Sequence, residues 1–189
     1  MRPGRPLALP ALLLPALLAA AELREIAVDH DGEVYSVDSV VWFDAPPDAV
    51  YAVFADWDLS TQFSSAIVAA HDIEALEDGG PGFYVKNRGC FLFFCRTVER
   101  QGAVAATPGT RLEAIADPGL SDFSLSDERW TFESSRGGTL VNYSLRMTPS
   151  FWVPPLIGPY VIKRKLREDG AEALDRIEAI AQARAAERG

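Results

Sequence analysis

Residues 128–145 read ERWTFESSRGGTLVNYSL, two alternating segments joined by a pair of glycines. In the first segment Trp130 and Phe132 share one face, opposite polar side chains. In the second segment Val141 and Tyr143 do the same. A period of two on both sides of a Gly-Gly turn predicts an antiparallel hairpin. One face of this sheet is expected to meet water and the other to be covered.

The same period extends through most of the chain, and Gly- and Pro-containing turns separate the segments. The predicted strands are Glu33–Phe43, Ile67–Leu76, Phe83–Arg88, Phe91–Val104, Arg111–Ala116, Ser124–Glu133 and Leu140–Met147. Between the first two strands, Pro46-Pro47 is typical of a helix start, and this helix is expected to end near Asp58. Leu59–Ser65 is predicted to add a second short helix.

Residues 161–188 lack proline and contain a single glycine. Leu166, Leu174 and Ile177 belong to an apolar stripe at helical spacing, which predicts a long amphipathic helix. The expected fold is α+β, a curved antiparallel sheet of about seven strands wrapped around this last helix. The space between sheet and helix is the natural ligand site.

The length and charge of the chain exclude one class of function, the binding of nucleic acids. The chain has 189 residues, enough for one ordinary domain, and a formal net charge of −9 with a pI near 4.7. Nucleic-acid binding needs a basic footprint, so no nucleic-acid partner is expected.

The N-terminal segment predicts export. Arg2 and Arg5 precede a short apolar run, and Ala19-Ala20-Ala21 fits a cleavage site, with Glu22 first in the mature chain. An uncleaved membrane anchor is the alternative, but Pro10 and Pro15 interrupt a run that is short for a span. We therefore expect a signal peptide over 1–21, a lead segment over 22–32 and a domain over 33–189. The protein is expected to be periplasmic or secreted.

Three stretches resemble the START / polyketide cyclase (SRPBCC, helix-grip) superfamily. They are DAPPDAVYAVFADWDLSTQF (44–63), ERWTFESSRGGTLVNYSL (128–145) and TPSFWVPPLIGPYVIKRKLREDGAEALDRIEAI (148–180). The resemblance implies a helix-grip fold that binds a hydrophobic small molecule or lipid, as a coenzyme Q-binding or cyclase-like member would. Non-enzymatic binding of such a molecule, with or without its transfer, is the first hypothesis. A cyclase/dehydrase acting on a polyketide-like substrate and a membrane-associated interaction module are the alternatives.

No catalytic group is assigned, and the two candidates are His71 and Glu128. Alternation places His71 on one face with Ile67, Ala69 and Ile73, where it could act as an acid or base if that face lines the cavity. Glu128 alternates with Trp130, so it is predicted to face inward, with a raised pKa or an arginine partner. A solvated position is the alternative for both.

Ligand-wall residues are predicted from the inward aromatic positions. They are Phe83, Phe93, Trp130, Phe132 and Tyr143. Ordinary core packing explains the same positions equally well.

An aromatic segment beside a basic cluster suggests a membrane surface or an acidic ligand. Trp152 lies in an apolar connection, and Lys163, Arg164, Lys165 and Arg167 follow it. A core cap beside a solvated helix face is the alternative.

Metal ions and cofactors are not expected. Zinc needs three or four Cys, His or carboxylate ligands in a recognisable set, and no nucleotide-binding loop is present.

The chain's two cysteines enclose an apolar stretch, GCFLFFC at 89–95. In one continuous strand Cys90 and Cys95 would be too far apart to bond. In a hairpin with Phe91–Phe94 as its loop they would lie opposite each other. The competing turn is Asn87-Arg88-Gly89, which leaves both thiols free. Export favours the disulfide.

Overall fold

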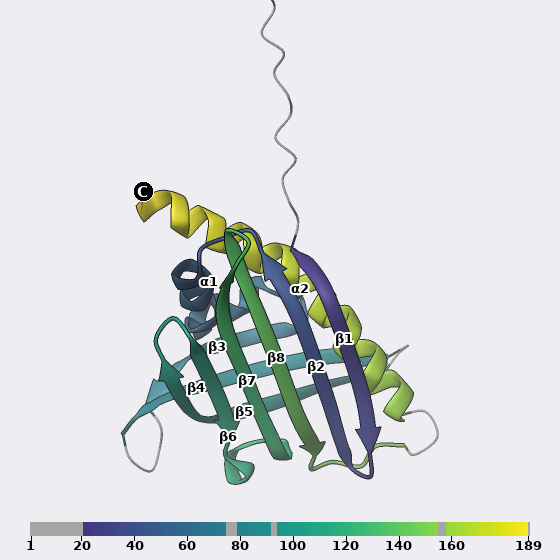
Figure 1. Cartoon of the computed structure of the whole chain (residues 1–189). Coiled ribbons are helices and arrows are strands. Elements are labelled where there is room, and N and C mark those ends of the chain that lie inside the picture. The colour runs from purple at the N-terminus through teal and green to yellow at the C-terminus, as the bar shows by residue number, and fades with distance from the viewer. Residues whose placement is uncertain (1–20, 75–78, 92–93, 155–157, 189) are drawn as a thin grey trace, which may run out of the picture.

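A computed structural model describes residues 21–74, 79–91, 94–154 and 158–188 of the chain. Within them one antiparallel sheet of eight strands curves around a long helix (Figure 1). The strands are β1 (Glu22–Asp31), β2 (Val34–Phe43), β3 (Ile67–Glu74), β4 (Pro81–Phe91), β5 (Phe94–Thr107), β6 (Arg111–Ala116), β7 (Phe123–Ser135) and β8 (Gly138–Pro149). The helices are α1 (Pro47–Phe54), the 3-10 turns η1 (Trp57–Gln62) and η2 (Pro118–Leu120), and α2 (Gly158–Arg188).

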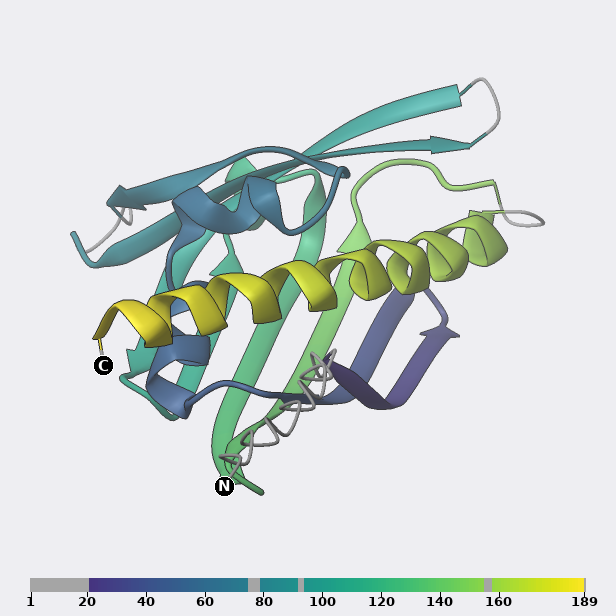
Figure 2. The same cartoon turned by 90° about the horizontal axis from the view of Figure 1, so that it is seen from above.

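The strand order is β1-β2-β8-β7-β6-β5-β4-β3, so the quoted hairpin β7–β8 lies inside the sheet. Helix α2 runs across the concave face, and α1 packs beside its second half (Figure 2). The predicted architecture, a curved antiparallel sheet around a C-terminal helix, is confirmed, with one strand more than expected.

The additional strand is β1, in the segment predicted to lead into the domain. It pairs with β2 over its whole length, with Val28 opposite Val37. It is an edge strand in which only Val28 is fully buried. Its charged residues gave the sequence no strong period-two signal, because an edge strand needs little apolar surface.

Two apolar clusters fill the space between the sheet and α2. Cluster one gathers under α1, η1 and the second half of α2, around Phe43, Trp57 and Phe83. Cluster two gathers around Tyr35 and Leu145, with Ile162 and Leu166 of the first half of α2 against it. Both halves of the helix are therefore held by apolar contacts with the sheet.

Strand β3 contains a bulge that reverses its alternation. Its pairing with β4 shifts between Ile67 and Ala69, so Ile67 and Ala70 pack on cluster one. His71 is exposed and its ring lies 4.8 Å from that of Tyr84. Tyr84 sits between the buried Phe83 and Val85, so His71 is on the outer face. The prediction that His71 shares a face with Ile67 is wrong, because an extra residue in a strand changes the parity of everything after it.

The cysteine pair closes the β4–β5 hairpin. Cys90 and Cys95 are directly opposed in the ladder, with a Cα–Cα distance of 4.0 Å, and form a disulfide. The favoured prediction is confirmed. The ladder continues to Phe91 opposite Phe94, so the loop is shorter than predicted, and the tip itself is outside the described residues. The competing turn at 87–89 is wrong, since those residues lie within β4.

Removing this disulfide is expected to lower the free energy of unfolding. A disulfide that closes so short a loop stabilises the folded protein by about 2 kcal/mol, because it lowers the conformational entropy of the unfolded chain. The double variant Cys90→Ser/Cys95→Ser should therefore unfold at lower urea concentration than the native chain. Adding a reductant should move the native midpoint and leave that of the double variant in place. Equal midpoints for both proteins without reductant would contradict the expectation.

No helix in the described part of the chain is long and apolar enough to cross a membrane.

Candidate functional site

An ion pair lies on the concave face of the sheet. Arg100 of β5 donates from Nη1 to Glu128 Oε1 of β7 at 2.6 Å, and the two side chains are only 13% and 9% exposed. Glu128 thus has the arginine partner that the sequence predicted as one of two outcomes. Arg100 itself was not foreseen, because nothing in its local sequence separates it from a surface arginine.

Two hydroxyl groups complete this arrangement, which we call the polar centre: Arg100, Ser126, Glu128 and Tyr143. Arg100 Nη1 also donates to Ser126 Oγ at 3.2 Å, and the Tyr143 hydroxyl donates to Glu128 Oε1 at 3.3 Å. Burial raises the pKa of Tyr143 well above its ordinary value, and the Glu128 carboxylate adds to the rise. Burial alone would lower the pKa of Arg100, but attraction to Glu128 raises it. Tyr143 is therefore a neutral donor and Arg100 a permanent cation.

Stability does not explain the polar centre. Two charged groups lose their hydration when they are buried. A protein in which apolar residues of the same volume replace such an ion pair is often equally stable. A buried ion pair in an otherwise apolar face is instead typical of a site where a polar group must be oriented. The position of the polar centre agrees with such a role, because Tyr143 contacts both apolar clusters and therefore lies where they meet.

The predicted aromatic wall lies next to the polar centre. Trp130 stacks on Tyr143, with ring centroids 5.3 Å apart, and lies 6.3 Å from Trp57, which in turn stacks on Phe83 at 4.7 Å. Phe132 is also buried in cluster one, and Phe93 lies outside the described residues. The Trp57 indole N–H is buried and has no hydrogen-bond partner in the described structure. The sequence offered no sign that Trp57 would join this row.

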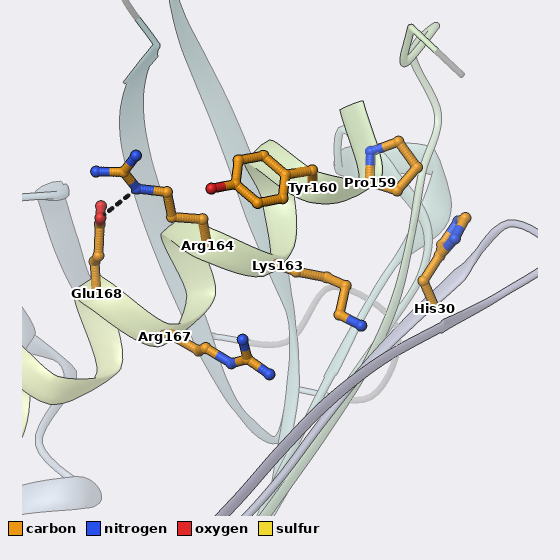
Figure 3. Close-up of a pocket in the computed structure, with 7 residues that line it drawn as sticks. All are labelled: His30, Pro159, Tyr160, Lys163, Arg164, Arg167 and Glu168. Atoms are coloured by element: carbon orange, nitrogen blue, oxygen red, sulfur yellow. Dashed lines mark hydrogen bonds and ion pairs between the residues drawn. The ribbon is translucent and has the colours of Figure 1, made fainter. Parts of the chain in front are cut away.

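A pocket of about 680 Å³ opens at the start of α2, and we call it the helix-start pocket (Figure 3). It is lined by His30 of β1 and by six residues of α2: Pro159, Tyr160, Lys163, Arg164, Arg167 and Glu168. Figure 3 shows Lys163 extending toward the strand that carries His30, whereas Arg164 turns to Glu168, at 2.6 Å. Within the described residues Lys163 and Arg167 form no ion pair, so they offer positive charge to the pocket.

A second pocket, of about 770 Å³, is lined mainly by outer-face residues of β1, β2, β6, β7 and β8, and also by Tyr143 of the polar centre. Both pockets open to solvent, and neither is lined by Arg100 or Glu128. Protein atoms pack around the ion pair in this conformation.

The predicted membrane-contact residues gather at one end of the molecule. Trp152 is 78% exposed and Tyr160 is 66% exposed, the highest values among the large apolar side chains of the described residues. The Arg96 guanidinium carbon lies 3.7 Å from the centroid of the ring of Phe151, the residue before Trp152. The segment that carries Trp152 therefore contacts the β4–β5 hairpin. Lys165 pairs with Asp169 at 2.9 Å and is less available than Lys163.

Three carboxylates also come together where η1 meets β3. Asp56, Asp58 and Asp72 place one oxygen each within 4.8 Å of one another. Asp56 is bound by Arg184 at 2.7 Å, and burial, followed by repulsion from Asp58 and Asp56, raises the pKa of Asp72. The sequence did not reveal this group, because Asp56 and Asp58 lie at the start of η1 and Asp72 lies in β3.

Comparisons with known proteins address the fold. No family model matches the chain, and no curated protein matches it. Solved structures do match. A START superfamily protein from Mycobacterium smegmatis superposes with a TM-score of 0.59 at 18% identity, covering 77% of this chain and 98% of that one. The Zhui aromatase/cyclase from Streptomyces sp. R1128 gives 0.61 at 12% identity, covering 80% and 95%.

The chain has a START-like, helix-grip fold. A STAR-related lipid transfer protein from Xanthomonas axonopodis shares it, with a TM-score of 0.59, 17% identity and coverage of 83% and 98%. The structures similar to this chain thus include a lipid transfer protein and an aromatase/cyclase. The coenzyme Q-binding subtype stays a prediction.

Proposed function

We propose that this protein binds a hydrophobic or lipid-like small molecule between the sheet and α2, with the polar centre holding the molecule's polar group. The observation that carries the proposal is the buried Arg100–Glu128–Tyr143 contact at the seam of two apolar clusters. Arg100 and Tyr143 are donors suited to a carbonyl or carboxylate oxygen. The apolar clusters on either side suit the remainder of the ligand.

Access to the polar centre depends on how α2 is held. Its second half is fastened to α1, to η1 and the residues after it, and to Asp44 after β2. Arg176, Gln182 and Arg184 donate hydrogen bonds to these segments, whereas Glu172 and Glu178 accept hydrogen bonds from them. In the first half, the ion pairs of Arg164 and Lys165 stay within the helix, and Ile162 and Leu166 supply apolar contacts to cluster two. The first half can therefore be displaced at lower cost, which opens the helix-start pocket toward the polar centre.

The direct test is to purify the full chain from its own host without detergent. Native mass spectrometry and organic-solvent extraction should reveal a bound hydrophobic molecule. If the host protein carries none, and neither fatty acids, phospholipids nor polycyclic aromatic probes bind at micromolar concentration, the proposal fails.

Replacing Tyr143 with phenylalanine is expected to weaken ligand binding roughly 3- to 10-fold. The substitution removes one hydroxyl donor and keeps the ring on Trp130, and one hydrogen bond contributes about this much. Titration of the extracted molecule into ligand-free protein measures the change. Tyr84→Phe is the matched control, because Tyr84 lies on the outer face, and it should leave the affinity unchanged. Equal affinities for the two variants would count against a polar anchor at Tyr143.

The cyclase/dehydrase alternative is not favoured. It needed His71 to meet Glu128 and Tyr143 in one pocket, and His71 lies on the opposite face of the sheet. Within the described residues the polar centre has no histidine, and its arginine stays protonated.

A membrane-facing end is the second candidate, and it complements ligand binding. The exposed Trp152 and Tyr160 support it, as do the charges of Lys163 and Arg167, which are unpaired within the described residues of a protein that is acidic as a whole. Aromatic side chains favour the lipid interface, and cations favour anionic head groups.

Lys163→Ala is expected to weaken binding to vesicles with anionic lipids about fivefold, since one cation near the surface contributes about 1 kcal/mol. Trp152→Ala should reduce binding further, and neutral vesicles should bind less than anionic ones. Flotation of the protein with liposomes measures this. Arg111→Ala and Ile115→Ala are the matched controls on the outer face of the sheet. Unchanged flotation of the Trp152 and Lys163 variants would contradict a membrane role.

Export remains part of the proposal. The Cys90–Cys95 disulfide is compatible with an exported protein.

A further inference from the structure

The helix-start pocket gathers positive charge from one side of α2. Lys163 and Arg167 are four residues apart, so they are neighbours on the surface of the helix. Figure 3 shows both side chains extending from α2 toward the strand that carries His30. The other two charged residues of α2 in the pocket, Arg164 and Glu168, pair with each other at 2.6 Å, so their charges cancel. Two positive charges therefore remain among the residues that line the pocket.

These two cations have no carboxylate partner within the described residues. Lys163 and Arg167 take part in none of the ion pairs found there, whereas the neighbouring Lys165 pairs with Asp169 at 2.9 Å. The chain as a whole carries a formal net charge of −9. Cations that are directed into a concave surface raise the local concentration of anions. An anion is therefore the partner that the pocket lacks by charge.

The opposite wall of the pocket supplies a donor from a second element. His30 of β1 is half-buried, and its ring stacks on that of the buried Tyr35, with centroids 4.3 Å apart. This stacking fixes the position of the imidazole, which carries at least one N–H in either protonation state. Donors that converge from two elements suit one bound molecule. Contact with a flat membrane instead needs side chains that point outward, as the exposed Trp152 can.

The charge and volume of the pocket select the class of anion. A phosphate monoester carries close to two negative charges at neutral pH, so it balances both cations, whereas a carboxylate balances one. Its oxygens also match the forked donors of a guanidinium. The pocket holds about 680 Å³. A water molecule occupies roughly 30 Å³, so a bare phosphate ion would leave most of the pocket empty. The ligand therefore carries an organic group beside its phosphate.

We propose that the helix-start pocket binds the phosphate group of an organic phosphate monoester, with Lys163, Arg167 and His30 as its donors. The site is separate from the polar centre, because neither Arg100 nor Glu128 lines this pocket. It also differs from a membrane-facing surface, because it needs the donor on β1. A soluble phosphate ester and a lipid with a phosphate monoester head group share this chemistry, and the tests below distinguish the two sources.

The first test is calorimetric titration of the purified full chain with glycerol 3-phosphate. The compound should bind with a Kd below about 1 mM, and glycerol should not bind. Lys163→Ala and Arg167→Ala each remove a charge-assisted hydrogen bond, so each should weaken binding roughly 10-fold or more. His30→Phe keeps a ring against Tyr35 and removes the N–H, and it should weaken binding roughly 3- to 10-fold.

Lys165→Ala is the matched control for this titration. It changes the net charge by the same amount as Lys163→Ala, but it removes a lysine that already pairs with Asp169 and does not line the pocket. Its affinity for glycerol 3-phosphate should stay within about twofold of the native value. If Lys163→Ala and Lys165→Ala weaken binding equally, the effect is one of overall charge and the proposal is overturned.

The second test examines a lipid as the source of the phosphate. Neutral vesicles are prepared with phosphatidic acid, whose head group is a phosphate monoester, or with phosphatidylglycerol, a diester, at equal surface charge. A lipid source predicts at least fivefold tighter binding to phosphatidic acid in flotation, and loss of this preference in His30→Phe. If glycerol 3-phosphate does not bind and the two kinds of vesicle bind equally, the proposal is overturned.

A third measurement needs no variant. Acetic anhydride labels the lysines of the native chain, and peptide mass spectrometry reads the labelling at each position. The probe that binds, glycerol 3-phosphate or phosphatidic acid vesicles, should slow the labelling of Lys163 severalfold. Glycerol, or vesicles with phosphatidylglycerol, should not have this effect. Labelling of Lys163 at the same rate with and without the bound probe contradicts the assigned site.

Discussion

Replacing Arg100 with methionine is expected to lower the free energy of unfolding by about 3 to 5 kcal/mol and to abolish ligand binding. The substitution leaves Glu128 buried, with a side chain 9% exposed and, among the described residues, only the Tyr143 hydroxyl as a partner. A buried carboxylate stripped of its cation is destabilising by about this amount. Urea unfolding measures the first effect, and titration with the extracted ligand measures the second.

The double variant Arg100→Met/Glu128→Leu separates stability from binding. Because it removes both charges, it should recover most of the lost stability, while the ligand's polar group still has no partner. Arg111→Met is the control, because the Arg111 side chain is 56% exposed and its partner Glu113 keeps a second ion pair with Arg129. This substitution should lower the free energy of unfolding by less than about 1 kcal/mol. If Arg100→Met unfolds like the control, or if the double variant binds ligand as well as the native chain, the polar centre is not the anchor that we propose.

Gly102→Ala is expected to lower the free energy of unfolding by about 3 kcal/mol, the upper end of the usual cost of overpacking. A Cβ at Gly102 would lie 2.0 Å from the carbonyl oxygen of Ile115 and 2.7 Å from the Cα of Ala116. Both are backbone atoms of β6, so strands β5 and β6 must separate where Gly102 pairs with Ala116. Rotation of a side chain cannot relieve this contact.

Gly89→Ala tests whether any added methyl group in this part of the sheet has the same effect. Gly89 lies in β4, and a Cβ there meets no atom within 4 Å. Its substitution should change stability by less than about 1 kcal/mol. Gly102→Ala and Gly89→Ala with the same urea midpoint would contradict the close approach of β5 and β6.

Prediction from sequence succeeded where local periodicity was strong. Strands β7 and β8 are buried on one face along their length, so Trp130, Phe132 and Val141 repeat with a visible period of two. Helix α2 keeps an apolar stripe because it must cover that face, and Ile177 and Ala181 are indeed buried there. Strand β1 was missed because an edge strand carries few buried positions.

The candidate site was predicted in part. Glu128 was expected to face inward because it alternates with Trp130, and it does. Its partner Arg100 is 28 residues away, and only the β5-β6-β7 order brings the two together. His71 was predicted by the same rule to share a face with Ile67, and a single bulge in β3 puts the two on opposite faces.

The sequence by itself therefore determined the fold class, the covered face of the sheet and the helix that covers it, and it favoured a hairpin for Cys90 and Cys95. These features depend on hydrophobic periods of two and 3.6 residues and on short-range chemistry, both of which can be recognised from residues that are close together in the sequence. Only the tertiary structure decided the partners of Glu128 and Glu178 and the face of His71. Such contacts join residues that are far apart in the chain, and their geometry depends on strand order and on bulges that no local pattern records.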